Sequence, residues 1–262
     1  MSIRIAMIGY GAIGSDVANA LLAGAIPGAT LCAVMTRHKP ELDLASTIQR
    51  TDAIGAILAL HPDLVIECAG AQALSAYVAT VLRAGIDVIS VSMAAMAQVE
   101  IEDEIAALDP ISCGQLGFAS GAVGALDVLS AAREGGLERV EVIQRKPPAA
   151  FGELIADQAM TEPRIMQQAS AREVALALPQ NANVAAAVAL AGLGFDRTQV
   201  TVIADPSMTR NTVEIKAQDR FGRFTLQIEN QPSPSNPKTS ITPAMSVLAA
   251  IRRRVSKVVI PI

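Results

Sequence analysis

The fold is decided by the stretch Ile3-Arg4-Ile5-Ala6-Met7-Ile8-Gly9-Tyr10-Gly11-Ala12-Ile13-Gly14. The apolar run up to Ile8 predicts a strand, and the residues from Ala12 to Leu22 predict the helix that follows. Gly9 permits the tight turn, Gly11 lets a pyrophosphate approach the backbone, and Gly14 lets the helix pack closely on the strand. The helix N-terminus would then face an anion, so we expect a bound dinucleotide rather than a turn that only packs. The expected contacts in this loop are Gly9, Gly11, Ala12, Ile13 and Gly14.

The composition is typical of a soluble α/β protein with a helix-covered parallel sheet. Of the 262 residues, 51% are hydrophobic but only 3% are aromatic, and tryptophan is absent. Such a length allows one large domain or two modest ones. The net charge is -4 and no basic block is interleaved with aromatic residues, which argues against nucleic acid and anionic membranes as partners. We therefore expect a small-molecule ligand.

Neither the N-terminus nor the cysteines indicate export. The N-terminal apolar run already belongs to the expected strand, and it lacks the separate charged and apolar regions of a signal peptide. Glycines, prolines and charges interrupt every apolar stretch before it is long enough to span a bilayer. Cys32, Cys68 and Cys113 lack the paired spacing of metal ligands, so we expect free, buried thiols and no metal in a cytoplasmic protein.

Alternating strands and helices indicate a Rossmann-type, doubly wound parallel sheet over residues 1–119. After the first helix, the expected strands are Thr30–Thr36, Asp63–Cys68 and Ile86–Val91. The strand at 63–68 ends in small residues, at the edge where such a sheet meets its cofactor, so we expect Ala69 and Gly70 to line that cleft. The next strand leads into Ser92, whose hydroxyl we expect to cap the following helix.

From about Ser120 the pattern indicates a second α/β domain with a mixed or antiparallel sheet, which we place at residues 120–238. Its expected helices are Val123–Arg133, Ala171–Ala177 and Val184–Leu193, and its expected strands are Arg139–Arg145, Gln199–Ala204, Asn211–Ala217 and Gly222–Asn230. A proline-rich loop then leads into a last helix at Thr239–Arg254. We expect residues 239–262 to return to the first domain.

The residues after the second expected strand bear on the choice between NAD and NADP. An acidic residue there takes the ribose hydroxyls of NAD, whereas an arginine accommodates the 2′-phosphate of NADP. Here the strand runs into Thr36-Arg37-His38-Lys39, which contains no acid. Two cations and a hydroxyl suit a phosphate dianion, so NADP is slightly preferred over NAD. The alternatives are use of both cofactors, or a solvated loop in which Arg37 and Lys39 bind nothing.

Four further motifs resemble one known family in their order and spacing. They are Ser120–Asp127, Pro179–Ala186, Ala204-Asp205-Pro206 and Asn236–Ser240. Together with the glycine loop, they resemble the L-aspartate dehydrogenase family over nearly the whole chain. The resemblance implies an architecture similar to that of dihydrodipicolinate reductases, a homodimer, and NAD(P)-dependent oxidation of L-aspartate to iminosuccinate, which can feed NAD biosynthesis. It also carries cofactor contacts onto Ala122 and Asn183, although a plain helix N-cap is the alternative for Asn183.

One position departs from the family pattern. The resemblance implies that the segment after Asp205-Pro206 runs to an asparagine, one more residue, and a histidine that acts as catalytic acid and base. Asn211 keeps this register, and Val213 stands where the histidine is expected. Valine cannot exchange a proton at any pH. Strand alternation places Val213, Ile215 and Ala217 on one face, which agrees with core packing.

Two functions follow from this departure. In the first, the chain is a dehydrogenase, or a reductase with a different carboxylate substrate, in which Lys146, Lys238, Arg210 or an ordered water handles the proton. In the second, it binds a nucleotide without catalysis. We expect an anionic substrate, because cations accompany the recognisable motifs. The candidate catalytic residues are Lys238, Arg210 and Asn211, with Arg145 and Lys146 as further cations. A proline turn and a helix start favour Lys238, although an exposed loop lysine is an equal alternative.

Overall fold

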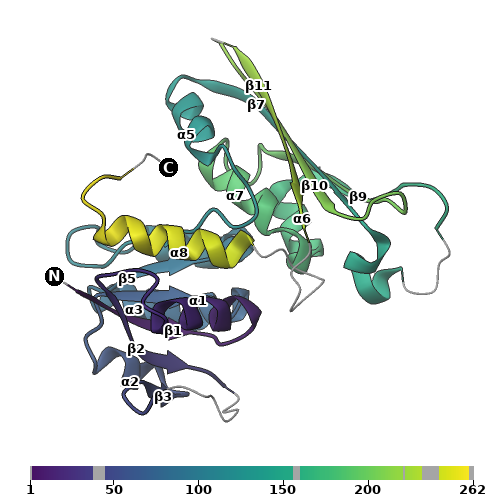
Figure 1. The fold of residues 1–262 in the computed structure, drawn as a ribbon. Coiled ribbons are helices and arrows are strands. Elements are labelled where there is room, and N and C mark those ends of the chain that lie inside the picture. The colour runs from purple at the N-terminus through teal and green to yellow at the C-terminus, as the bar shows by residue number, and fades with distance from the viewer. Residues whose placement is uncertain (1, 38–44, 156–159, 221, 232–241, 260–262) are drawn as a thin grey trace. The chain divides into compact units, whose positions relative to one another are not determined.

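The computed structural model describes residues 2–37, 45–155, 160–220, 222–231 and 242–259, and the chain forms two compact units (Figure 1). The first unit contains Met1–Gly121 and Pro243–Ile260, and the second contains Ala122–Thr242 and Pro261–Ile262. The core of the first unit is therefore assembled from two separate segments of the chain. None of the described helices is long and apolar enough to cross a membrane.

The described part of the first unit forms a six-stranded sheet whose paired strands are all parallel. The strands are β1 (Ile3–Ile8), β2 (Ala29–Met35), β3 (Gln49–Thr51), β4 (Leu64–Glu67), β5 (Asp87–Ser90) and β6 (Leu116–Phe118). Their order is β3-β2-β1-β4-β5-β6, so the direction of winding reverses between β1 and β4. This confirms the predicted doubly wound parallel sheet, in which ligands bind outside the carboxyl ends of the strands at that reversal.

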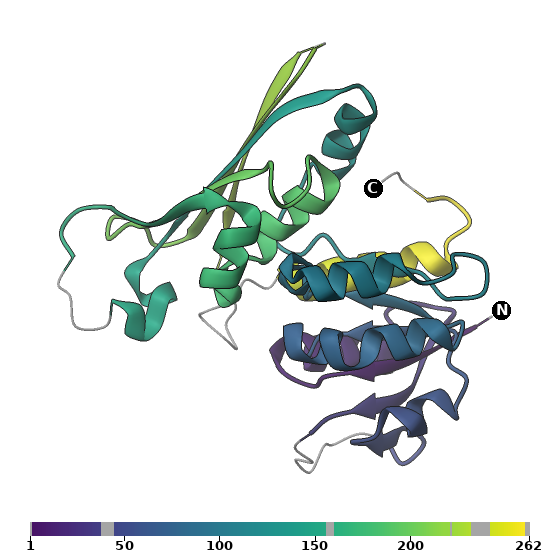
Figure 2. The ribbon, with the colours of Figure 1, turned by 180° about the vertical axis from the view of Figure 1, so that it is seen from behind.

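Helices cover both faces of this sheet. The helices α1 (Ala12–Leu22) and α8 (Thr242–Val255) lie in front of it in Figure 1, whereas α3 (Ala71–Arg83) and α4 (Val99–Ala106) lie in front in Figure 2. A short helix α2 (Ile54–Leu58) follows β3, and a 3-10 helix η1 (Met93–Ala97) follows β5. Because both faces are covered, β4 is buried along its whole length, which explains the apolar run Leu64–Ile66 before the buried Glu67.

The last helix completes the core of the first unit, although it follows the second unit in the chain. Val247 and Ile251 of α8 are fully buried in the same apolar cluster as Ile5 of β1. At the surface, Arg254 Nη1 lies 2.8 Å from Asp87 Oδ2 at the start of β5. The helix begins at Thr242. The predicted helix began at Thr239, and residues 239–241 lie outside the described residues.

The described part of the second unit forms a five-stranded mixed sheet, as predicted. Its strands are β7 (Leu137–Lys146), β8 (Arg164–Ser170), β9 (Gln199–Ala204), β10 (Asn211–Asp219) and β11 (Arg223–Asn230). They follow the order β11-β10-β7-β9-β8, in which the central pair of β7 and β9 is parallel and the other pairs are antiparallel. The end of β7, the end of β9 and the start of β10 therefore meet at one edge of the sheet.

Helices pack on one face of the second sheet. They are α5 (Leu126–Glu134), α6 (Ala171–Ala177) and α7 (Asn183–Ala191), with 3-10 turns η2 (Pro148–Leu154) and η3 (Pro179–Asn181) beside them (Figure 1, Figure 2). In β10, Val213, Ile215 and Ala217 are 3%, 0% and 4% exposed, whereas the residues between them are more accessible. This alternation confirms the predicted buried face of the strand.

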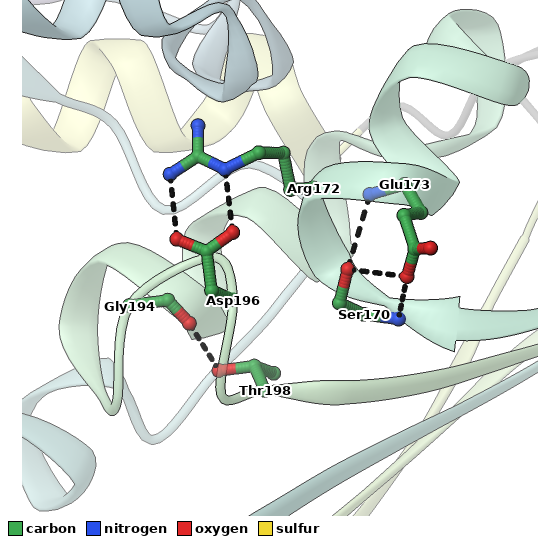
Figure 3. Close-up of polar contacts among 6 residues, drawn as sticks. All are labelled: Ser170, Arg172, Glu173, Gly194, Asp196 and Thr198. Carbon is green, nitrogen blue, oxygen red and sulfur yellow. Dashed lines mark hydrogen bonds and ion pairs between the residues drawn. The ribbon is translucent and has the colours of Figure 1, made fainter.

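Polar contacts fix the start of α6 and the loop before β9 (Figure 3). Ser170 and Glu173 form a capping box, in which each side chain accepts a hydrogen bond from the backbone N–H of the other residue. Arg172 donates to both carboxylate oxygens of Asp196, at 2.6 and 2.9 Å, and the Thr198 hydroxyl donates to a carbonyl four residues earlier, at 2.9 Å. These contacts hold a helix and a loop together and have a structural role.

The three cysteines are free thiols, as predicted, but only one of them is buried. Cys68, the residue after β4, is 9% exposed, and burial raises the pKa of its thiol far above the ordinary range, so it stays protonated. Cys32 and Cys113 are partly exposed, so the prediction of buried thiols is wrong for them. Cys113 lies in the turn that precedes β6, where solvent has access.

Candidate functional site

A pocket of about 530 Å³ lies at the carboxyl ends of β1, β2 and β4 in the first unit. Its size falls in the range of small-molecule sites, roughly 300–1,000 Å³. The residues that line it are Ile8, Gly9, Tyr10, Gly11, Met35, Thr36, Arg37, Cys68, Ala69, Gln72, Ala73, Ala76 and Tyr77. The pocket therefore sits where the order of the strands reverses, which is the position that this architecture uses for ligands.

Each glycine of the loop has a different steric requirement. Gly9 has a φ of +102°, and a Cβ at this position would lie 2.7 Å from the backbone nitrogen of Ala69. A Cβ on Gly14 would lie 2.4 Å from the carbonyl oxygen of Gly9. Nothing described lies within 4 Å of a Cβ placed on Gly11, so its backbone is open to a ligand. The geometry thus agrees with the predicted roles, which are a tight turn at Gly9, an open approach at Gly11 and a close packing contact at Gly14.

Two helices begin at this edge of the sheet, and their N-termini differ. The N–H groups of Ala69 and Gly70, just before α3, donate to Glu67 Oε1 at 2.7 and 2.8 Å. An internal carboxylate thus satisfies two N–H groups of the turn that leads into α3. Gly11 precedes α1, which has no acidic residue in its first turn and no side-chain cap within the part of the chain that the structure describes. The N-terminus of α1 would therefore attract an anion.

Glu67 belongs to a buried hydrogen-bond network behind the pocket. It is 0% exposed, and its second carboxylate oxygen accepts a very short hydrogen bond from the Ser90 hydroxyl. The Ser92 hydroxyl also bonds to Glu67, and the Ser92 N–H donates to Ser90 Oγ at 2.9 Å. Burial raises the pKa of Glu67, and these hydrogen bonds oppose that shift. The prediction that the Ser92 hydroxyl caps the following helix is wrong, because the hydroxyl is used by Glu67.

The predicted dinucleotide contacts fall into two groups around this pocket. Gly9, Gly11, Arg37 and Ala69 line it. The structure places Ala12, Ile13 and Gly14 in the first turn of α1, and Gly70 in the turn fixed by the carboxylate. Three polar side chains that line the pocket were not predicted, and they are Tyr10, Gln72 and Tyr77. The last two lie on α3, whose accessible side carries no motif that marks a ligand site.

The end of β2 borders the pocket with polar groups. Thr36 and the exposed Arg37 both line it, and the described lining residues include no Asp or Glu. Lys39, the second cation of the predicted phosphate site, lies outside the described residues. The described end of β2 therefore has a cation and no acid that would repel a phosphate.

In the second unit, charged side chains gather where β7 and β9 end. Arg145 Nη1 lies 3.4 Å from Asp205 Oδ2. Asp205 Oδ1 also accepts hydrogen bonds from the N–H (3.0 Å) and hydroxyl (2.6 Å) of Ser207, which together with Arg145 lower the pKa of Asp205. On the next residue of β7, Lys146 Nζ donates to Asn181 Oδ1 at 2.7 Å, and burial lowers the pKa of this lysine to about 8.

The other predicted residues of the second unit occupy the same sheet or its helices. Arg210 is half-exposed, with Nη1 3.7 Å from Glu229 Oε2, and Asn211 is the first residue of β10. The Ala122 carbonyl accepts from the side chain of an asparagine at the end of β11, at 3.0 Å. Asn183 is the first residue within α7 and not its N-cap, so the capping alternative is wrong. Lys238 lies outside the described residues.

Val213 faces a polar side chain that has no hydrogen-bond partner among the described residues. In the antiparallel pair of β10 and β7, Val213 lies directly opposite Gln144, so the two side chains share the helix-covered face. Gln144 is 0% exposed, and neither its Oε1 nor its Nε2 has a hydrogen-bond partner among the described residues. Native structures rarely leave such a group unpaired, so the contact is a local mismatch in the core.

Comparison with known proteins connects both units to one family. A model described as "Aspartate dehydrogenase, C-terminal" matches residues 127–254, and one described as "Homoserine dehydrogenase, NAD binding domain" matches residues 9–111. L-aspartate dehydrogenase 2 of Bordetella bronchiseptica is 40% identical over 98% of each chain. L-aspartate dehydrogenase of Ruegeria pomeroyi is 41% identical over 96% of this chain and 92% of its own.

Solved structures agree at the level of the fold. The crystal structure of aspartate dehydrogenase from Thermotoga maritima superposes with a TM-score of 0.82, at 24% identity, over 99% of this chain and 100% of that one. A hyperthermophilic archaeal homoserine dehydrogenase in complex with NADPH gives 0.57 at 11% identity, over 96% and 97% of the two chains. With relatives about 40% identical over nearly its full length, the chain belongs to the L-aspartate dehydrogenase family.

Proposed function

We propose that this protein is a nicotinamide-dependent L-aspartate dehydrogenase, which oxidises L-aspartate to iminosuccinate. The observation that carries the proposal is the full-length identity of about 40% to proteins named L-aspartate dehydrogenase, combined with the glycine-loop pocket. In water the product hydrolyses to oxaloacetate and ammonia. Iminosuccinate that escapes hydrolysis would serve as a precursor in NAD biosynthesis.

The first unit fits a dinucleotide. Gly11 offers an open backbone at the uncapped start of α1, where a pyrophosphate would accept N–H hydrogen bonds. The tight contact of Gly9 with Ala69 leaves the pocket wall free of a side chain at that point. When bound, the nicotinamide supplies the hydride acceptor. We propose Ala12, Ile13, Gly14, Gly70, Ala122 and Asn183 as further contacts of this cofactor.

We further propose that NADP is preferred over NAD. Arg37 lines the pocket at the end of β2, where it would pair with a 2′-phosphate. A charge-assisted contact contributes about 1.5–3 kcal/mol, so Arg37→Ala is expected to raise the KM for NADP roughly 10- to 100-fold and to change the KM for NAD little. Arg83→Ala, which removes an exposed arginine paired with Glu104, is the matched control. A wild-type preference for NAD would overturn this part of the proposal.

For the substrate we propose carboxylate contacts from the second unit. Arg210 is half-exposed, with Nη1 3.7 Å from Glu229 Oε2, and the side-chain oxygen of Gln231 accepts hydrogen bonds from its Nε and Nη2 at 3.1 and 2.9 Å. The exposed part of its guanidinium would contact a dicarboxylate. Asn211, the next residue, would donate an amide hydrogen bond to the same ligand. The role of Lys238 stays a prediction from the sequence, because this residue lies outside the described part of the chain.

The test of the activity is a steady-state assay of purified protein with L-aspartate and either oxidised cofactor, followed by absorbance of the reduced nicotinamide. L-Glutamate and L-alanine serve as comparison substrates, and oxaloacetate with ammonia tests the reverse reaction. Turnover that favours aspartate at least tenfold supports the proposal. Cofactor binding, detected by fluorescence, without turnover of any amino acid would instead identify a nucleotide-binding protein without catalysis.

We also propose a homodimer that forms through the second sheet. The face of this sheet that no described helix covers carries Ile165, which is 56% exposed and pairs with Ile203 of β9. Light scattering after gel filtration is expected to give about twice the chain mass of 27.2 kDa. Ile165→Glu is expected to shift the protein towards the monomer, and a wild-type protein that runs as a monomer would exclude the dimer.

A further inference from the structure

One wall of the pocket in the first unit is formed by helix α3. The residues of this helix that line the pocket are Gln72, Ala73, Ala76 and Tyr77. Their spacing places all four on one side of the helix, whereas the buried residues of α3, which include Leu74 and Val78, lie on another side. The helix therefore uses one side for the core and presents a different side to the pocket.

The polar side chains of this wall are available to a ligand. Gln72 is exposed and Tyr77 is half-buried, and no hydrogen bond joins either side chain to another residue in the described part of the chain. The other tyrosine of the pocket, Tyr10, packs against the apolar core of the first unit, and Tyr77 is not among the described members of that cluster. Of these two aromatic rings, that of Tyr77 is therefore the better placed to contact a ligand.

The connectivity of a dinucleotide decides which part of it reaches this wall. The proposed cofactor places its pyrophosphate at Gly11 and its 2′-phosphate at Arg37, and both residues line the pocket. The adenine base is bonded to the ribose that carries the 2′-phosphate, so the base lies in the same pocket. The lining residues at the ends of β1 and β2, Ile8 and Met35, are each only 2% exposed. The main accessible surface left for the base is therefore the wall formed by α3.

We propose that this side of α3 is the adenine site of the pocket, an inference that rests on the proposed function. The ring of Tyr77 stacks on the base and supplies affinity, since stacking depends little on which base is present. The carboxamide of Gln72 supplies selectivity, because its oxygen accepts from the adenine amino group while its nitrogen donates to N7. Ala73 and Ala76 keep the middle of the wall shallow enough for a planar ring. Every residue of this site belongs to the first unit.

A steric test uses two adjacent positions of α3. Ala76 and Ser75 are both exposed, but only Ala76 is a lining residue of the described pocket. Ala76→Leu is expected to fill the adenine site and to raise the Kd for NADPH at least tenfold, measured by fluorescence titration. Ser75→Leu adds the same side chain to the same helix and is expected to keep the wild-type Kd within about twofold.

Removal of the ring tests the stacking contact. Stacking of a base on an aromatic side chain contributes about 5- to 150-fold in affinity, so Tyr77→Ala is expected to raise the Kd for NADPH by such a factor. Tyr77→Phe keeps the ring and is expected to stay within about threefold of wild type. Adenosine 2′,5′-bisphosphate, which carries no nicotinamide, is expected to show the same order of affinities by titration calorimetry. This probe separates the adenine contact from any contact with the nicotinamide.

The selectivity of Gln72 is tested with a cofactor that carries hypoxanthine in place of adenine. Its carbonyl oxygen replaces the adenine amino group, so the oxygen of the Gln72 side chain would face an acceptor instead of a donor. Wild type is expected to bind NADPH about tenfold more tightly than this hypoxanthine analogue. Gln72→Leu is expected to bind both cofactors with Kd values within about twofold of each other.

The outcomes separate the two proposals. A wild-type protein that binds neither NADPH nor NADH contradicts the cofactor site of the proposed function. A wild type that binds cofactor, with folded Tyr77→Ala and Ala76→Leu variants that keep its Kd within about twofold, contradicts the adenine site alone. Equal losses in Ala76→Leu and Ser75→Leu also overturn it. Equal affinity of wild type for the adenine and hypoxanthine cofactors overturns the role of Gln72.

Discussion

The side-chain amide of Gln144, which has no partner in the described part of the chain, affects stability at the scale of a single residue. Replacement of a buried group without partners by an apolar side chain removes a desolvation penalty of about 1–3 kcal/mol. Gln144→Leu is therefore expected to raise the free energy of unfolding by that amount, measured by urea denaturation. Gln227→Leu on the exposed side of β11 is the control and is expected to change stability by less than about 0.5 kcal/mol. A less stable Gln144→Leu protein would show that the amide has a partner after all.

Glu67 connects stability to cofactor affinity. Glu67→Ala leaves two N–H groups and the Ser90 hydroxyl without their acceptor, which is expected to cost about 3 kcal/mol of unfolding free energy. The released turn at Ala69 is expected to raise the Kd for NADPH, measured by fluorescence titration. Glu67→Gln keeps an oxygen for both amides and is expected to lose far less. Equal affinity in wild type and Glu67→Ala would show that other contacts hold the turn.

Burial of Lys146 also predicts a pH dependence of stability. Its pKa is about 8 in the folded protein, below the ordinary 10.5, so the unfolded state binds more protons between these values. Wild-type unfolding free energy is therefore expected to gain up to about 1.4 kcal/mol per pH unit from 8 to 10.5, and to lose this gain as the pH falls through 8. Lys146→Met is expected to lack the rise. Parallel stability curves for the two proteins would contradict the lowered pKa.

Some residues of the site could be predicted from the sequence and others could not. The glycine loop was predictable because backbone geometry at Gly9 and Gly14 excludes any side chain, which leaves a clear pattern. Glu67 was not, since one acid at the end of an apolar strand gives no sign of its buried partner Ser90, which comes from the next strand, 23 residues later. The partners of Lys146 depend in the same way on a turn far along the chain.

At the scale of elements, α8 is the last helix of the chain and stabilises the core of the first unit. Ile251 is 0% exposed, so Ile251→Ala is expected to cost about 2–5 kcal/mol through lost apolar contacts and the cavity left behind. Met245 on the same helix is 54% exposed, and Met245→Ala is expected to cost less than about 0.5 kcal/mol. Chemical denaturation of both variants checks the difference, and similar values for both would contradict the packing of α8.

Element prediction succeeded where periodicity was strong and failed where it was short or polar. The bounds of α1, α6 and β9 agree with the predicted ones at both ends. The strand β8 was missed, because its sequence RIMQQAS has little apolar alternation, and β3 and β6 were missed because each has three residues. Helix α5 begins three residues later than predicted, since Ala125 adopts a left-handed φ of +58°.

At the scale of the whole molecule, cofactor binding is expected to stabilise the fold. A ligand at 100 times its Kd adds about 2.7 kcal/mol to the unfolding free energy, so NADPH is expected to raise the Tm. In Gly9→Ala the Cβ would collide with Ala69, and this shift is expected to disappear. Gly55→Ala in α2 meets nothing within 4 Å and is expected to keep it. A full shift in Gly9→Ala would contradict binding at the glycine loop.

The first unit is built from two separate segments of the chain, and this has a consequence for protein synthesis. During translation, the strands of the second unit are complete once Asn230 has left the ribosome, whereas the first unit still lacks α8. Until Val247 and Ile251 emerge, the face of the first sheet that they cover stays open to other chains and to chaperones. The second unit can therefore reach its native contacts first, although the ribosome begins with the other one.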